Sequence, residues 1–171
     1  FKQKTAYEIY QCDWSSDVCS SDLAAKSLRL ADFESHLSDA RMAFFNLQYG
    51  DTTQETARLP RGATFNTTTA FDRFNDIDAL AAYISALDLV VTVSNTTAHL
   101  AAALGVPTWV LAPQPRARLW YWFEDGAHSP WYPGARIFRA QDGAEWPGVL
   151  TKFSAALSAL SSLESPRNQR L

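Results

Sequence analysis

The stretch DLVVTVSNTTAHLAAALGVPTWVLAP, residues 88–113, constrains the fold more than any other part of the chain. It reads as an apolar strand, a polar turn, an alanine-rich helix, a Gly-x-Pro turn and a second apolar strand. Strands that are apolar on both faces and alternate with helices are typical of parallel strands covered on both sides. The sequence therefore predicts an α/β fold with a doubly wound, Rossmann-like parallel sheet.

Helix and strand signals alternate through the rest of the chain. Apolar residues at helical spacing predict helices within 26–40, 76–87 and 145–163, and a short helix within 52–59. Short apolar runs predict strands at 42–48, 62–67 and 135–140, and the turn SPWYPG at 129–134 precedes the last of them. We expect one domain over residues 24–163, followed by a flexible tail at 164–171.

Residues 1–23 resemble the translation of a sequencing-library adapter. The codons GAC TGG AGT TCA GAC GTG TGC TCT TCC GAT encode Asp13 through Asp22, and KQKTAYEI fits another part of the same adapter. Processing scars of this kind are excluded from fold reasoning. We therefore expect residues 1–23 to lie outside the fold, and the domain to lack its first strand. The alternative is a genuine segment in which Cys12 and Cys19 form a disulfide or half of a metal site.

Composition argues against several functional classes. The chain has 15 Lys and Arg against 18 Asp and Glu, a formal net charge of −3, so nothing indicates a nucleic-acid or acidic-membrane partner. The sequence has no apolar run of about 20 residues, the length that a transmembrane helix needs. Both cysteines lie within residues 1–23, so the remainder has no thiol nucleophile and no cysteine metal site. We expect a cytoplasmic protein.

The turn at residues 94–97 predicts an anion site. The first turn of a helix has unpaired N–H groups and a partial positive charge, which suit a phosphate. Ser94 or Asn95 caps this helix, the hydroxyls of Thr96 and Thr97 add donors, and Gly105 ends the helix. No G-x-G-x-x-G or Walker sequence competes with this loop. The alternative is ordinary helix capping in an α/β protein without a ligand.

These residues resemble a known family. The runs ALDLVVTVSNTTAHLAAALGVPTWVLAP (86–113) and SPWYPGARIFR (129–139) look like the C-terminal half of a GT-B glycosyltransferase. The resemblance is to heptosyltransferase-like family 9 proteins, often joined to tetratricopeptide repeats, and more distantly to O-linked N-acetylglucosamine transferases. It extends over KSLRLADFESHL (26–37) and FFNLQYGDTTQE (44–55), and so covers nearly all of the chain after residue 24.

The resemblance implies roles for the residues of the turn. Thr96 and Thr97 match positions whose hydroxyls and amides hold the nucleotide diphosphate, and Asn95 matches the polar position beside them. Ser94 falls where heptosyltransferases commonly have an aspartate. This departure weakens the transfer of heptose specificity to this chain.

The resemblance implies three further substrate-binding residues. His99 matches a histidine in the helix after the turn, for which we favour a structural or phosphate-proximal role over that of a catalytic base. Lys26 falls near a basic residue that faces the phosphates in relatives, and Gln48 lies in the matching run 44–55. Asp76-x-Asp78 imitates a metal-binding D-x-D, but it begins a helix, where acidic residues complement the helix dipole, so we predict no metal.

An aromatic and basic cluster follows residue 115. Its members suit stacking on a base or sugar, and equally suit covering a sheet edge or facing another domain. They are Arg116, Arg118, Trp120, Tyr121 and Trp122.

The resemblance implies that the chain binds an ADP- or UDP-linked sugar donor without a metal or other cofactor. The acceptor site and the catalytic base belong to an N-terminal domain that this chain lacks, so the fragment alone is expected to be inactive. Two alternatives remain open: half of a nucleotide-sugar epimerase, or a degenerate, non-catalytic binding module of a repeat protein.

Overall fold

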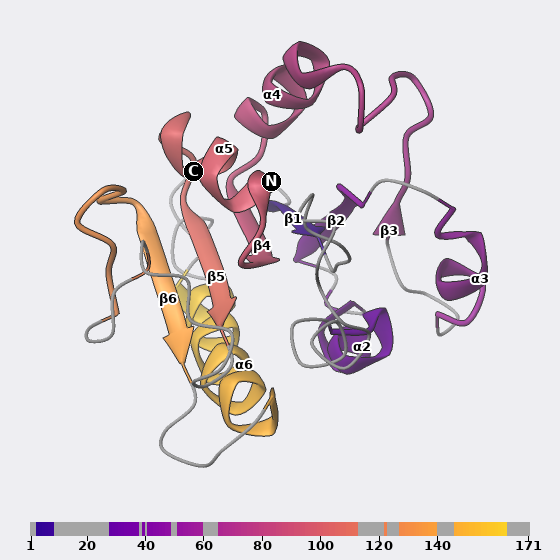
Figure 1. The fold of residues 1–171 in the computed structure, drawn as a ribbon. Helices are drawn as coiled ribbons and strands as arrows, with labels where there is room; N and C mark the ends of the chain where they lie inside the picture. The colour runs from indigo at the N-terminus through magenta and orange to yellow at the C-terminus, as the bar shows by residue number, and fades with distance from the viewer. Residues whose placement is uncertain are drawn as a thin grey trace, which may run out of the picture.

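Six parallel strands form the sheet in the described part of the chain, in the order β3-β2-β1-β4-β5-β6 (Figure 1). The computed structural model describes residues 3–8, 28–37, 39, 41–48, 51–59, 65–112, 122, 127–139 and 146–163. The strands are β1 (Gln3–Glu8), β2 (Met42–Asn46), β3 (Phe65–Asn66), β4 (Leu89–Val93), β5 (Thr108–Ala112) and β6 (Ala135–Arg139). This order confirms the predicted doubly wound, Rossmann-like α/β fold.

Helices cover both faces of this sheet. They are the 3-10 helix η1 (Leu30–Phe33), α2 (Glu34–Leu37), α3 (Thr53–Thr56), α4 (Ile77–Ser85), α5 (Thr96–Ala103) and α6 (Trp146–Leu163). η1, α2 and α6 pack on one face around Phe44 and Phe153, while α4 and α5 pack on the other around Val90 and Ala101. Among these described helices, none is long and apolar enough to cross a membrane.

Strand β4 is buried along its whole length, which explains its uninterrupted apolar sequence. Leu89, Val91 and Val93 belong to the core beneath α6, and Val90 belongs to the core beneath α4 and α5. Fully burying one such side chain contributes about 1.5–3 kcal/mol. The strand is therefore held firmly on both faces, and the position at which it ends is well determined.

Helix α5 ends as the sequence predicts. Gly105 has a φ of 78°, a left-handed conformation in which glycine has no side-chain clash. Its N–H donates to the carbonyl of Ala102 at 3.2 Å, and the N–H of Val106 donates to the carbonyl of Ala101 at 3.1 Å. This pair of bonds is the Schellman motif, which satisfies carbonyls at the end of the helix and turns the chain into β5.

Strand β1 contradicts the expectation that residues 1–23 lie outside the fold and that the first strand is absent. Gln3–Glu8 lies between β2 and β4 and pairs with both in parallel. Without it, the facing N–H and C=O groups of β2 and β4 would be unpaired inside the sheet. Ladder hydrogen bonds join backbones, so a segment with strand formers such as Thr5 and Tyr7 fills that position whatever its origin.

The other expected boundaries are not tested by these strands. Residues 9–27 and 164–171 all lie outside the described residues. The predicted domain at 24–163 and the tail at 164–171 therefore stay predictions.

Replacing Ala6 with proline tests whether Gln3–Glu8 is a strand of the folded protein. Proline has no N–H, so it removes a ladder hydrogen bond from a strand with neighbours on both sides. We expect the free energy of unfolding, measured in urea, to fall by about 2 kcal/mol or more, because a buried carbonyl also loses its partner. Ala6→Ser keeps the N–H and is the control. Equal stability of Ala6→Pro and the parent would place these residues outside the fold.

Candidate functional site

The turn at residues 94–97 lies at the carboxyl edge of the sheet, between the end of β4 and the start of α5. Strand β1 has β2 on one side and β4 on the other, so the chain order changes direction there. Ligands of doubly wound sheets bind outside the carboxyl ends of the strands at such a switch point. The fold therefore places the predicted turn where a ligand is expected.

Asn95, and not Ser94, is the cap of α5. Its backbone is extended, with φ −150° and ψ −178°, and its side-chain oxygen accepts from the N–H of Ala98 at 3.0 Å. The hydroxyl of Thr92 donates to the same oxygen at 3.2 Å. Asn95 thus satisfies one of the amides of the first turn, and those of Thr96 and Thr97 have no acceptor within the helix.

The two threonines occupy different environments. Thr96 is exposed at the first position of the helix, whereas the side chain of Thr97 is buried, with 6% of its surface exposed. Thr96 is therefore accessible to a ligand without any movement of the chain. The backbone N–H of Thr97 points toward the start of the helix, because helical N–H groups point along the axis toward the N-terminus.

Ser94 is bound to an aromatic residue from later in the chain. The indole N–H of Trp122 donates to the hydroxyl oxygen of Ser94 at 2.8 Å. Trp122 is itself buried, with 3% of its surface exposed, and stacks on His99 with ring centroids 4.8 Å apart and planes inclined by 16°. Trp122 therefore packs against helix α5.

His99 is packed among aromatic rings. Its Nδ1 lies 3.1 Å from the hydroxyl of Tyr132, to which it is hydrogen-bonded, and the two rings meet edge to face at 5.6 Å. Burial lowers the pKa of His99 below its ordinary value, because desolvation penalises the charged imidazolium. This packing favours the structural or phosphate-proximal role over that of a catalytic base.

A second polar group lies at the carboxyl ends of β2 and β3. Asn46 is fully buried; its amide nitrogen donates to the hydroxyl of Thr52 at 2.8 Å, and its oxygen accepts from the N–H of Gln48 at 2.9 Å. Arg73 donates to the carbonyl of Gln48 at 3.1 Å and to that of Thr68. Burial lowers the pKa of Arg73. These bonds tie together the chain segments that follow the two strands.

Two atoms of this group have no hydrogen-bond partner in the structure. They are the side-chain oxygen of Gln48 and the Nε of Arg73, and both are buried. Sequence reasoning had named Gln48 but missed Asn46 and Arg73. The available signal was Asn46 itself, a polar residue at the end of an otherwise apolar, aromatic strand.

The remaining predicted residues have different outcomes. Asp76 lies at the start of α4, as predicted, and the structure adds that its carboxylate accepts from the N–H of Ala79 at 2.9 Å and so caps the helix. Among the described residues, no group of three or more His, Cys, Asp or Glu side chains gathers in a way that could hold a metal ion. Lys26 lies outside the described residues, as do four members of the aromatic and basic cluster, namely Arg116, Arg118, Trp120 and Tyr121.

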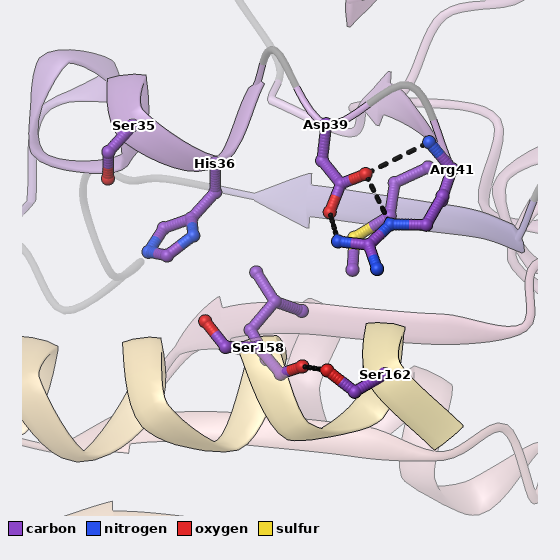
Figure 2. Close-up of a pocket in the computed structure, with 8 residues that line it drawn as sticks. Ser35, His36, Asp39, Arg41, Ser158 and Ser162 are labelled. Carbon is purple, nitrogen blue, oxygen red and sulfur yellow. Dashed lines mark hydrogen bonds and ion pairs between the residues drawn. The ribbon is translucent and has the colours of Figure 1, made fainter. Parts of the chain in front are cut away.

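A pocket of about 300 Å³ lies at the opposite edge of the sheet, near the start of β2, and sequence reasoning had not predicted it. Figure 2 shows its polar lining, in which Asp39 holds the guanidinium of Arg41 at 2.7 and 2.9 Å. His36 is hydrogen-bonded to Ser154 at 2.8 Å. The ionisable groups of this pocket thus bind other protein groups, and none lies at the carboxyl edge where the predicted residues meet.

Comparison with curated proteins gives one relative. The chain is 30% identical over 147 residues to Protein FlbA of Caulobacter vibrioides, a match that covers 84% of this chain and 24% of FlbA. The chain thus spans about a quarter of the length of that relative. No family model matches the chain.

Comparison with solved structures supports the fold. E. coli heptosyltransferase WaaC with ADP is similar with a TM-score of 0.57 and 14% identity, over 95% of this chain and 46% of WaaC. WaaC with ADP-2-deoxy-2-fluoro heptose gives 0.61 and 15%, over 93% and 44%. E. coli ADP-heptose LPS heptosyltransferase II gives 0.59 and 17%, over 96% and 48%. The chain therefore has an α/β fold that matches about half of the length of each of these GT-B glycosyltransferases.

The burial of His99 generates a prediction about its titration. Its folded-state pKa lies below the unfolded value of about 6.5, so the unfolded chain binds the proton more readily. The contribution of His99 to stability is thus fully present above pH ~6.5 and declines as the pH falls toward the folded-state pKa. We expect NMR titration of the ring nitrogens to give a midpoint below 6.5 in the folded protein, returning to the ordinary value in urea. A folded midpoint at or above 6.5 would contradict this.

Proposed function

We propose that this chain is the nucleotide-sugar-binding part of a glycosyltransferase, and that the turn at residues 94–97 holds the diphosphate of the donor. The observation that carries the proposal is the open start of α5 at the switch point of the sheet, with Thr96 exposed beside it. Similarity of the fold to heptosyltransferases, of which one was solved with ADP and with an ADP-sugar analogue, supports it.

The chemistry of this turn suits a departing diphosphate. In glycosyl transfer the bond from the sugar carbon to the phosphate oxygen breaks, and the oxygen leaves with the electron pair. Helix N–H groups and the hydroxyl of Thr96 donate toward the negative charge that develops there, which lowers the barrier if they bind it more strongly than the intact donor. We expect this stabilisation to come from the chain's own donors, without a metal ion.

The group around Gln48 extends the proposed site. The buried side-chain oxygen of Gln48 has no partner and can accept a hydrogen bond from a hydroxyl of the nucleotide sugar. The Nε of Arg73, which also has no partner, can donate a hydrogen bond to the nucleotide sugar. Strands β2 and β4 are separated by β1 alone, so their ends lie roughly 10 Å apart. This spacing suits a ligand that reaches from the diphosphate to a ribose or sugar hydroxyl.

The acceptor and the catalytic base are assigned to another part of the whole protein, since the chain spans under half of each solved relative. We leave open whether the base of the sugar donor is adenine or uracil, and which sugar the donor carries. Tetratricopeptide repeats in the whole protein and a cytoplasmic location belong to the same proposal.

Changing Thr96 and Thr97 together to valine tests the diphosphate site. Valine keeps the shape of threonine but removes both hydroxyls, and a hydrogen bond to a charged group is worth about 1.5–3 kcal/mol. We expect ADP or UDP, whichever binds the 171-residue chain, to bind at least about tenfold more weakly, or on the order of 2 kcal/mol. Isothermal titration against the matching monophosphate measures the preference for the second phosphate.

Thr56→Val on α3 is the matched control, because the hydroxyl of Thr56 bonds to carbonyls of its own helix region. It is expected to leave nucleotide affinity unchanged. Equal binding of mono- and diphosphates by the parent chain, or undiminished affinity in the double variant, would leave the turn as ordinary helix capping. A single Thr96→Val variant separates the exposed hydroxyl from the buried one.

A further inference from the structure

We propose that Trp122 is a positioning residue that turns the hydroxyl of Ser94 into a directed donor for the diphosphate. This inference rests on the proposed function, because it concerns the same turn. It assigns a role to a residue whose position in sequence, 28 residues beyond Ser94, gives no hint of the contact.

The direction of the hydrogen bond carries the inference. The indole N–H can only donate, so Ser94 must accept at its hydroxyl oxygen, over 2.8 Å. A serine that accepts keeps its own proton to donate elsewhere. The hydrogen bond from Trp122 also holds the hydroxyl oxygen of Ser94 in place, so the hydroxyl proton of Ser94 can point only away from the indole. Ser94 is only partly buried, and we assign its remaining donor direction to the ligand.

Trp122 is held rigidly enough to act in this way. Its ring is buried among Ala98, Ala102 and Val110 and stacks flat on His99. Its carbonyl accepts a hydrogen bond from the guanidinium of Arg139 at the end of β6. The indole is thus anchored to α5 and to the sheet, and not to the turn alone. A hydroxyl whose orientation is already fixed loses less conformational entropy on binding than a hydroxyl that rotates freely.

Tyr132 extends the same arrangement. Its hydroxyl is hydrogen-bonded to Nδ1 of His99, and its ring lies 6.1 Å from that of Trp122. The rings of Tyr132, His99 and Trp122 therefore pack together on one side of α5 and connect the segment before β6 with the turn. These contacts give the polar imidazole of His99 partners in an alanine-rich helix.

Trp122→Phe is the decisive variant, because phenylalanine keeps an aromatic ring for the stack and removes the N–H donor. Isothermal titration of the 171-residue chain with ADP and AMP measures the preference for the diphosphate. We expect the affinity for ADP to fall about three- to tenfold and the preference over AMP to shrink with it. Trp122→Phe with unchanged ADP affinity would overturn the inference.

Trp146→Phe is the matched control. Its indole N–H is also buried but has no hydrogen-bond partner in the structure, and its partly buried ring packs against the core on the α6 side of the sheet. It undergoes the same change in size and is expected to leave the ADP to AMP preference intact. An equal loss in Trp146→Phe would mean that general repacking lowers affinity, and would overturn the role of Trp122.

Ser94→Ala keeps the test decisive if Trp122→Phe does not fold. It is expected to reduce the preference for ADP by the same factor, to shift the indole N–H resonance of Trp122 in NMR spectra, and to add no further loss when combined with Trp122→Phe. Undiminished ADP preference in Ser94→Ala would overturn the inference. A parent chain that does not distinguish ADP from AMP would instead refute the proposed function itself.

Discussion

The parallel pairing of β4 with neighbours on both sides is the constraint on which the rest of the structure depends. β5 joins it through Val90 to Val93, and β1 joins it on the other edge, while helices bury both of its faces. A strand held on four sides ends at a fixed place. The polar turn after Val93 and the start of α5 consequently lie at the switch point of the sheet. Ligands of doubly wound sheets bind there, and the partial positive charge of a helix N-terminus suits an anion.

Around that turn, the structure uses some polar groups for its own stability and leaves others for a ligand. Asn95 is committed to Ala98 and Thr92, and this bond fixes the first turn of α5. We propose that the hydroxyl of Thr96 and the N–H groups of Thr96 and Thr97 bind the ligand, and that the indole N–H of Trp122 orients the hydroxyl of Ser94. Across the sheet edge, Asn46 and Arg73 hold the segment that carries Gln48. The cap and the buried networks therefore hold the groups of the proposed site in place.

Local sequence could predict the sheet class, the helix at 77–85, the left-handed Gly105 and the place of the turn, because each depends on a short pattern of burial or backbone conformation. It could not predict the contact between Trp122 and Ser94 or the tie between Arg73 and Gln48, because both join segments far apart in the chain. The pairing of Gln3–Glu8 was missed for another reason. Its resemblance to a translated adapter argued against selection for folding, yet backbone hydrogen bonds can pair any suitable strand with β2 and β4.

The most direct test of the central claim is an amide NMR titration of the isotope-labelled chain with ADP, repeated with AMP. If the start of α5 holds the diphosphate, the N–H resonances of Thr96 and Thr97 shift most, and they shift further with ADP than with AMP at saturation. Shifts confined to residues around the pocket of His36 and Arg41 at the opposite edge of the sheet, or identical shifts with the two nucleotides, would contradict the account.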